Sequence, residues 1–355
     1  MSEKNNDVRI LCLNGGGARG LFTISVLAEI ERIIEEKPGR NNVKAGDYFD
    51  LITGTSIGGI LALGLAAGKS ARELEIEFRH KAPDIFPPRP SWLTALRATF
   101  LPRYKSQPLY DTVANMVGKK TTFNDLSRRV MIPAVNLSTG KPQFFKTPHN
   151  PEFNRDGRLT LVDAAMATSA APTYFAPHYC EDLAAYFADG GLVANNPSFI
   201  GLHEVFRDMK LHFPDADVSA VKILNIGTLG EEYTVSPAAL SSKWNRGYLG
   251  LWGLGARLVL TTMTANQLLH KAMLLRELRD HDAVDNYVYL DDTIPNEAAS
   301  DITLDNASES SLRNLESRGK QLATVEYTKN VKLRAFFENT AVPFKQHKPS
   351  PEEQN

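Results

Sequence analysis

Cysteine is scarce in this chain of 355 residues, which contains only Cys12 and Cys180. Two cysteines cannot form a disulfide framework or a thiolate metal cluster, and they suit a reducing compartment. The chain also has no large excess of positive or negative charge, because its formal net charge is -1 at pH 7. This balance excludes a polycation that coats nucleic acid, so neither DNA nor RNA is expected as a partner. The N-terminus, MSEKNNDV, has no apolar run typical of a secretory signal, and a cytoplasmic protein is expected.

One uncharged run, residues 51–68, is long enough to raise the question of a membrane span. It contains five glycines and changes from a strand-like to a helix-like pattern at a tight turn. This arrangement favours a buried core segment over a membrane helix.

Strand-like and helix-like segments alternate along the chain, which is typical of an α/β fold with a parallel sheet covered on both faces. The patterns predict strands at residues 8–13, 48–53, 130–137, 143–146, 185–188, 221–226 and 287–290. They predict helices at residues 21–37, 57–68, 71–81, 160–171, 198–209 and 254–278, with a final helical region at 310–337. The proline-rich stretch 83–108 is expected to be an irregular lid, binding loop or insert. No clear linker divides the chain, so one domain over residues 1–340 is predicted, followed by a polar tail over 341–355.

Ser56 lies in the segment Gly54-Thr55-Ser56-Ile57-Gly58, which fits the G-x-S-x-G nucleophile elbow. In such an elbow a strained strand-to-helix turn exposes the serine Oγ, and the helix that follows favours developing negative charge. Gly54 and Gly58 are required because side chains there would collide with the neighbouring strand and helix. The pattern is short, so a glycine-rich turn with a buried serine is the alternative interpretation.

Two further glycine-rich turns follow predicted strands. In the segment 15–20, GGGARG, successive glycines let backbone N–H groups converge as an oxyanion hole requires. The competing interpretation is a phosphate-binding loop, since Gly15, Gly17 and Gly20 satisfy the spacing G-x-G-x-x-G. After residues 185–188 comes Asp189-Gly190-Gly191, where the carboxylate can accept a proton from Ser56. An ordinary Asp-Gly turn is the alternative there.

The motifs NGGGARG, GTSIG and DGG, in that order, resemble the patatin family of lipid acyl hydrolases. SAAPTYF at 169–175, DGGLVANNP at 189–197 and LDNASESSLRNL near the C-terminus strengthen the resemblance, which spans residues 8–338. It implies a three-layer patatin-like fold and a Ser-Asp dyad that needs no metal or other cofactor for catalysis. The implied site comprises Ser56 as nucleophile, Asp189 as general base, Gly15, Gly16 and Gly17 as oxyanion donors, and Arg19, Gly54, Gly58, Gly190 and Gly191 as supporting residues. His203 and His212 follow Asp189 in the chain, so sequence order alone leaves a Ser-Asp-His triad open.

Basic and aromatic residues are interleaved in two stretches without Asp or Glu, residues 85–110 and 233–276. Such stretches suit an anionic membrane surface or a nucleotide ligand, and chance segregation of charge is the remaining explanation. The compact form of the chain, with a short polar N-terminus, resembles the CapV type of CBASS phospholipase effectors in bacterial antiphage defence. That branch implies activation by a cyclic dinucleotide such as cGAMP and hydrolysis of membrane phospholipids at the inner face of the membrane.

Two other functions remain open at this point. One is a constitutive esterase or thioesterase that acts on soluble acyl substrates, and the other is a binding protein that holds phosphate in the loop 15–20. The sequence leaves the oligomeric state open as well, including assembly induced by the ligand. A regulatory ligand is expected to order residues 83–108 or 233–276 and so open access to Ser56.

Overall fold

The computed structural model describes residues 7–88, 101–153, 155–229, 241, 251–293 and 302–345. Its strands are β1 (Val8–Leu13), β2 (Leu51–Gly54), β3 (Arg129–Asn136), β4 (Lys141–Lys146), β5 (His178–Cys180), β6 (Ala185–Asp189), β7 (Val221–Ile226) and β8 (Tyr287–Leu290). Its α-helices are α1 (Gly20–Glu35), α2 (Ile57–Ala66), α3 (Ala71–Ile85), α5 (Ser106–Val117), α6 (Leu161–Thr168), α7 (Gly191–Ala194), α8 (Ser198–Asp208), α9 (Ala256–Asp280), α10 (Glu309–Lys329) and α11 (Val331–Ala335).

The strands form one sheet in the order β5-β6-β3-β2-β1-β7-β8, and β4 pairs with β3. The pairs β1–β2, β1–β7, β2–β3 and β7–β8 are parallel. The pairs β3–β4, β3–β6 and β5–β6 are antiparallel. The predicted parallel sheet is therefore confirmed for its central part, and it continues into an antiparallel edge formed by β4, β5 and β6.

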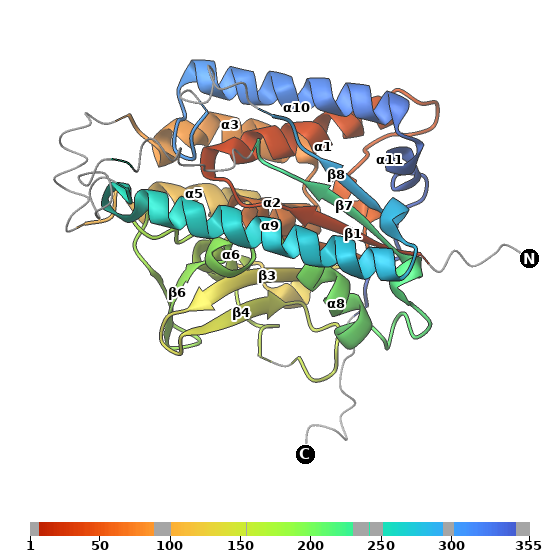
Figure 1. Ribbon diagram of the computed structural model, residues 1–355, viewed down its shortest axis with the longest axis horizontal. Helices are drawn as coiled ribbons and strands as arrows, with labels where there is room; N and C mark the ends of the chain where they lie inside the picture. The colour runs from red at the N-terminus through yellow and green to blue at the C-terminus, as the bar shows by residue number, and fades with distance from the viewer. Residues whose placement is uncertain are drawn as a thin grey trace, which may run out of the picture.

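Helices cover both faces of this sheet, which gives three layers (Figure 1). α1, α3 and α10 lie on one side, and α8 and α9 lie on the other. Successive side chains of β1 point to opposite faces of the sheet, so this one strand contributes to the hydrophobic core on each face. Leu11 and Leu13 belong to the larger core with α1 and α10, whereas Ile10 and Cys12 pack with α8 and α9.

Local sequence patterns predicted most elements, and β1, β7 and β8 have the predicted boundaries. Three features differ. The stretch predicted as irregular includes the end of α3 and the start of α5, while residues 89–100 lie outside the described residues. β5 had no sequence signal, since it is a three-residue edge strand. Within the predicted polar tail, Ala341 and Phe344 are buried because both apolar side chains pack against the body of the protein.

The start of α2 lies unusually close to the end of β1. A Cβ atom on Gly58 would be 2.3 Å from the Leu13 carbonyl oxygen and 2.6 Å from that of Asn14. Both obstacles are backbone atoms, so they cannot move aside as a flexible side chain can. Any side chain at position 58 therefore forces α2 away from β1.

We expect Gly58→Ala to lower the free energy of unfolding by about 1–3 kcal/mol, the usual cost of overpacking a core. Gly201→Ala is the matched control, because its Cβ would meet its nearest neighbour, the Thr53 methyl group, at 3.4 Å. That substitution should change stability by less than about 1 kcal/mol and can raise it. Urea denaturation of both variants measures the difference, and equal stability of the two would contradict the packing argument.

Candidate active site

Ser56 lies at the corner between β2 and α2 in a strained backbone conformation, with φ 55° and ψ -126°. A positive φ is uncommon outside glycine and costs free energy that the surroundings must offset. The Ser56 N–H donates to Thr168 Oγ1 at 3.0 Å, and that hydroxyl donates to the Pro133 carbonyl oxygen at 2.6 Å. Gly54 permits the turn, since a Cβ there would be 2.1 Å from the Gly58 carbonyl oxygen. The elbow is thus held by α6 and β3 as well as by its own glycines.

Asp189 ends β6 and meets Ser56 from the neighbouring segment of the sheet. The Ser56 Oγ donates to Asp189 Oδ2 at 2.7 Å, and the Gly191 N–H donates to Oδ1 at 2.7 Å. The register of β3 with β6 places Asp189 opposite Ala134, two strands away from the end of β2. Two sequence-predicted residues, 133 positions apart in the chain, therefore form a direct hydrogen bond.

The Asp189 carboxyl group is completely buried. Burial raises its pKa to about 7, and the hydrogen bonds from Ser56 and Gly191 partly oppose that shift. Removal from water disfavours the charged form, which explains the direction. A carboxylate with a pKa near neutrality is a stronger base than an ordinary aspartate and is suited to accept the serine proton.

The glycine loop before α1 lies beside this pair. The Gly15 N–H donates to the Asn195 carbonyl oxygen at 3.1 Å, so it is not available to an oxyanion. Within the part of the chain that the structure describes, the Gly16 and Gly17 N–H groups have no hydrogen-bond acceptor. The expectation of three donors is corrected to these two, because Asn195 already occupies the first.

The residues predicted to support the site make the following contacts. Arg19 donates from Nε to the Gly16 carbonyl oxygen at 3.4 Å and from Nη1 to that of Leu229 at 3.3 Å, so it contacts the loop from outside. A Cβ on Gly190 would be 2.1 Å from the Pro133 carbonyl oxygen, and one on Gly191 would be 2.4 Å from the Met263 methyl group. Gly190 therefore permits the close approach of β3, and Gly191 that of the Met263 side chain on α9.

An apolar pocket of about 40 Å³ extends from the Ser56 and Asp189 side chains. Its walls include Phe86 and Phe175 on one side and Val259 and Met263 of α9 on another. Pockets that bind drug-sized ligands usually have volumes of about 300–1,000 Å³. In this conformation the pocket is therefore too small for a fatty acyl chain, although its lining has the right chemistry for one.

The histidines are not part of this arrangement. No histidine is among the described residues that line the pocket. His203 packs in α8 against Phe199 and Phe206, and His212 packs against Phe344. The described residues include no group of three or more His, Cys, Asp or Glu side chains that could hold a metal ion. No described helix combines the length and the hydropathy of a membrane span.

Sequence analysis missed Thr168, Asn195 and Met263. Thr168 positions the serine backbone, Asn195 occupies the Gly15 amide, and Met263 closes the pocket. Asn195 lies in the segment DGGLVANNP at 189–197, but no local pattern predicts that its carbonyl oxygen accepts a hydrogen bond from the Gly15 N–H. No sequence signal indicates Thr168 or Met263, since each acts through a contact with a distant segment.

Parts of the two acid-free stretches fall outside the described residues, namely residues 89–100, 233–240 and 242–250. The described end of the first stretch is not a solvated basic surface. Arg103 forms an ion pair with Asp305 at 2.5 Å, and its guanidinium lies over the Tyr174 ring. Tyr104 is buried against Phe86.

Comparisons with known proteins agree with this geometry. Residues 11–200 match the family described as patatin-like phospholipase. A Vibrio cholerae serotype O1 protein named cGAMP-activated phospholipase is 70% identical over 96% of this chain and 97% of its own length. A protein of the same name from Escherichia coli strain TW11681 is 70% identical over 95% of each chain. The crystal structure of VipD from Legionella pneumophila is similar with a TM-score of 0.39 and 12% identity, covering 90% of this chain and 67% of that one.

The matched region contains the end of β1, the glycine loop, the serine elbow and the aspartate turn, and the two relatives match nearly the whole chain. This chain belongs to the patatin-like phospholipase family.

Proposed function

We propose that the protein is a phospholipase in which Ser56 and Asp189 form a catalytic dyad that releases fatty acids from membrane phospholipids. The observation that carries this proposal is the hydrogen bond of 2.7 Å from Ser56 Oγ to a buried carboxylate. A serine hydroxyl is a weak nucleophile unless an adjacent base accepts its proton. Here the base is in place, and its raised pKa matches the task.

In the first half-reaction, the Ser56 Oγ attacks the ester carbonyl carbon while its proton passes to Asp189 Oδ2. The negative charge on the carbonyl oxygen is stabilised by the N–H groups of Gly16 and Gly17. Collapse of the tetrahedral intermediate expels the lysolipid alkoxide, which takes the proton from Asp189 and leaves Ser56 acylated. Water then attacks the acyl group, Asp189 accepts the water proton, and the fatty acid departs as Ser56 regains its hydrogen.

We also propose that a cyclic dinucleotide of the cGAMP type activates the enzyme. Two relatives that are 70% identical over almost the full length are named cGAMP-activated phospholipases. The pocket volume of about 40 Å³ supports a resting state that needs activation, and Val259 and Met263 of α9 are part of its lining. Activation then requires a ligand that binds the open conformation more tightly than the closed one. The substrate is expected to be the phospholipid of the inner membrane face.

Substitution of either dyad residue should abolish hydrolysis without unfolding the protein. Ser56→Ala and Asp189→Asn are each expected to lower kcat by roughly 10⁴-fold or more, as in serine hydrolases that lose part of their catalytic unit. His203→Ala is the control and should retain activity within about threefold, since its ring lies outside the pocket. Fatty-acid release and fluorophosphonate labelling measure these effects. Loss of activity in the folded His203 variant would replace the dyad with a triad.

The activity should depend on pH through Asp189. The base must be ionised, so kcat/KM is expected to fall about tenfold per unit below pH 7 and to level off above it. For stability the sign is opposite. The pKa of Asp189 is raised in the folded state, so its contribution to stability is lost as pH rises through about 7. Asp189→Asn should therefore gain stability relative to the wild type between about pH 4 and pH 7 and gain no more above pH 7, and a constant difference across this range would contradict the assigned burial effect.

Nucleotide dependence is tested with phospholipid vesicles and a panel of cyclic dinucleotides. The expected result is fatty-acid release that requires both Ser56 and one member of the panel. Release that requires Ser56 but ignores every nucleotide would establish a constitutive lipase. Activity on short-chain soluble esters with none on vesicles would favour an esterase of soluble acyl substrates.

A further inference from the structure

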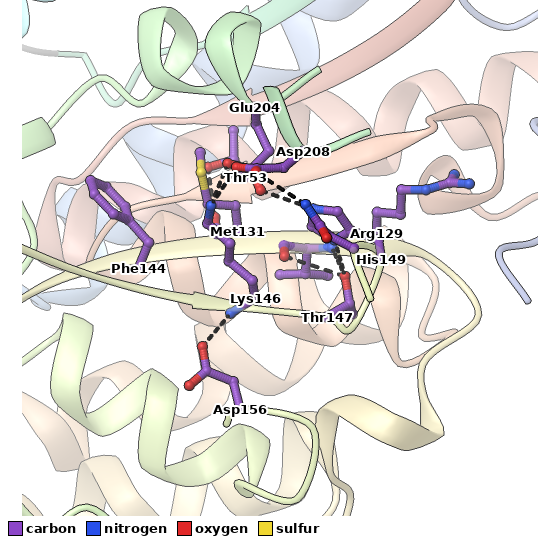
Figure 2. A network of polar contacts seen from close by, with 12 residues as sticks. Thr53, Arg129, Met131, Phe144, Lys146, Thr147, His149, Asp156, Glu204 and Asp208 are labelled. Atoms are coloured by element: carbon purple, nitrogen blue, oxygen red, sulfur yellow. Dashed lines mark hydrogen bonds and ion pairs between the residues drawn. The ribbon is translucent and has the colours of Figure 1, made fainter. Parts of the chain in front are cut away.

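A largely buried polar network lies among β3, β4 and α8 (Figure 2). Glu204 of α8 is its centre, with Oε1 2.9 Å from His149 Nε2 and Oε2 2.7 Å from Lys146 Nζ. The Thr147 hydroxyl is 2.9 Å from His149 Nδ1, which completes the histidine's contacts. The charges of this network are thus paired among themselves. The Arg129 side chain lies next to it but points away from it in Figure 2.

Arg129 is a buried cation without an ion pair among the described residues. The residue is 4% exposed, its Nη1 makes one long hydrogen bond of 3.4 Å to the Asp50 carbonyl oxygen, and its Nε has no partner. Burial lowers its pKa to about 10. Isolated buried charges are strongly unfavourable unless a partner compensates them. Such a guanidinium is therefore a feature that needs an explanation.

Two aromatic rings contact this guanidinium. Its Cζ lies 5.1 Å from the centroid of Phe213 and 4.9 Å from that of Phe344. These cation–π contacts favour the charged group but use none of its N–H donors. A guanidinium edge matches the spacing of two oxygens on a phosphate or a carboxylate.

Arg129 lines a cleft of about 750 Å³ at the amino ends of β1, β3 and β7, whereas Ser56 follows the carboxyl end of β2. The volume lies within the usual range for sites that bind drug-sized ligands. A second buried donor or acceptor in the lining, His212 Nδ1, also has no hydrogen-bond partner. The charged residues of the cleft are Arg9, Arg129, Lys222, Lys345, Asp7, Asp50 and Glu338.

Most of these charges have partners of their own. Lys222 pairs with Asp7, and Arg9 donates from its side chain to the carbonyl oxygens of Phe336 and Asn339. Asp50 Oδ2 accepts the Arg9 N–H at 2.9 Å. Four cations and three carboxylates line the cleft, so one positive charge is in excess. Arg129 remains as the buried cation without a carboxylate within ion-pair distance.

We propose that this cleft binds the activating nucleotide and that Arg129 holds one of its phosphodiester groups, an inference that rests on the proposed activation. The guanidinium edge donates to two phosphate oxygens, and the cleft volume accommodates the rest of the ligand. His212, at the same wall, supplies a further polar contact. No described residue of the two acid-free stretches lines the cleft, and the cleft shares no described lining residue with the catalytic pocket.

Strand β3 connects this cleft to the elbow. Arg129 is the first residue of β3, and Pro133 lies four residues further along the strand. The Pro133 carbonyl oxygen accepts a hydrogen bond from the Thr168 hydroxyl, and that hydroxyl accepts one from the Ser56 N–H. The same strand pairs with β6 at Asp189 through Ala134. A ligand that shifts the start of β3 therefore acts on contacts of both dyad residues.

Hydrogen exchange of the full chain, with and without the cyclic dinucleotide that activates it, locates the ligand directly. We expect protection at residues 129–131, 212–213 and 341–344. Calorimetric titration then tests Arg129→Ala, with a Kd increased by about 10- to 150-fold, the range for loss of charge-assisted hydrogen bonds. Arg129→Lys keeps the positive charge and the buried aliphatic part of the side chain, so it serves as a second variant in case Arg129→Ala does not fold. It should also bind at least about tenfold more weakly, because an ammonium group cannot donate two parallel hydrogen bonds to one phosphate as a guanidinium can. Arg313→Ala, at an exposed arginine on α10, is the control and should bind like the wild type.

The outcomes separate this site from the proposed activation. Protection confined to residues 85–110 or 233–276, with normal binding by Arg129→Lys, would overturn the cleft while leaving activation intact. If no cyclic dinucleotide increases fatty-acid release, the activation proposal fails, and pyrophosphate alone is used as the probe. Thermal stabilisation by pyrophosphate that is lost in both Arg129 variants would still support an anion site, and its absence in the wild type would overturn it.

Discussion

The hydrogen bond between Ser56 and Asp189 sets the main demand on this structure, because it must form where water is excluded. Burial is what raises the pKa of Asp189 to about 7, so the strength of the base depends on the packing around it. The hydroxyl and the carboxylate come from segments 133 residues apart, and β3 lies between their strands. The Thr168 hydroxyl links them further, since it contacts both the Ser56 amide and the β3 backbone. The arrangement of β2, β3 and β6 thus sets the geometry of this one hydrogen bond.

The same exclusion of water leaves little room for substrate. A pocket of about 40 Å³ keeps the carboxylate dry but cannot hold an acyl chain, so the acyl chain must displace side chains such as Met263 and Phe86. In the resting state, substrate binding and the exclusion of water from Asp189 therefore oppose each other. A ligand that favours the open conformation changes this balance only by the difference in its affinity for the two conformations. A closed resting pocket is a physical means of keeping a phospholipase from its own membrane.

Short-range patterns predicted the parts of the site that each turn makes alone. The serine elbow, the glycine loop and the aspartate turn each follow a strand whose apolar run is visible in the sequence. Contacts between distant segments could not be predicted in this way. The Asn195 carbonyl occupies the Gly15 amide, and Phe344 folds back onto Arg129 from a segment that looked like a polar tail. A single apolar residue in a polar stretch has no periodicity, so only its partner in the fold reveals its role.

Arg129 shows how a local cost can be useful in such a fold. A guanidinium packed between Phe213 and Phe344 without an ion pair raises the free energy of the ligand-free state. An anion in the cleft removes that cost, so its binding energy includes the relief of an unfavourable charge. This change in free energy arises at Arg129, the first residue of β3. Later residues of the same strand contact Thr168 and pair with β6. Because packed strands move as units, a small displacement at one edge of the sheet reaches the other. A charge without an ion pair among the described residues, at the start of β3, and a strained serine after β2 are thus joined through the hydrogen bonds of Pro133, Thr168 and Ser56, which is the path that control of Ser56 from the cleft requires.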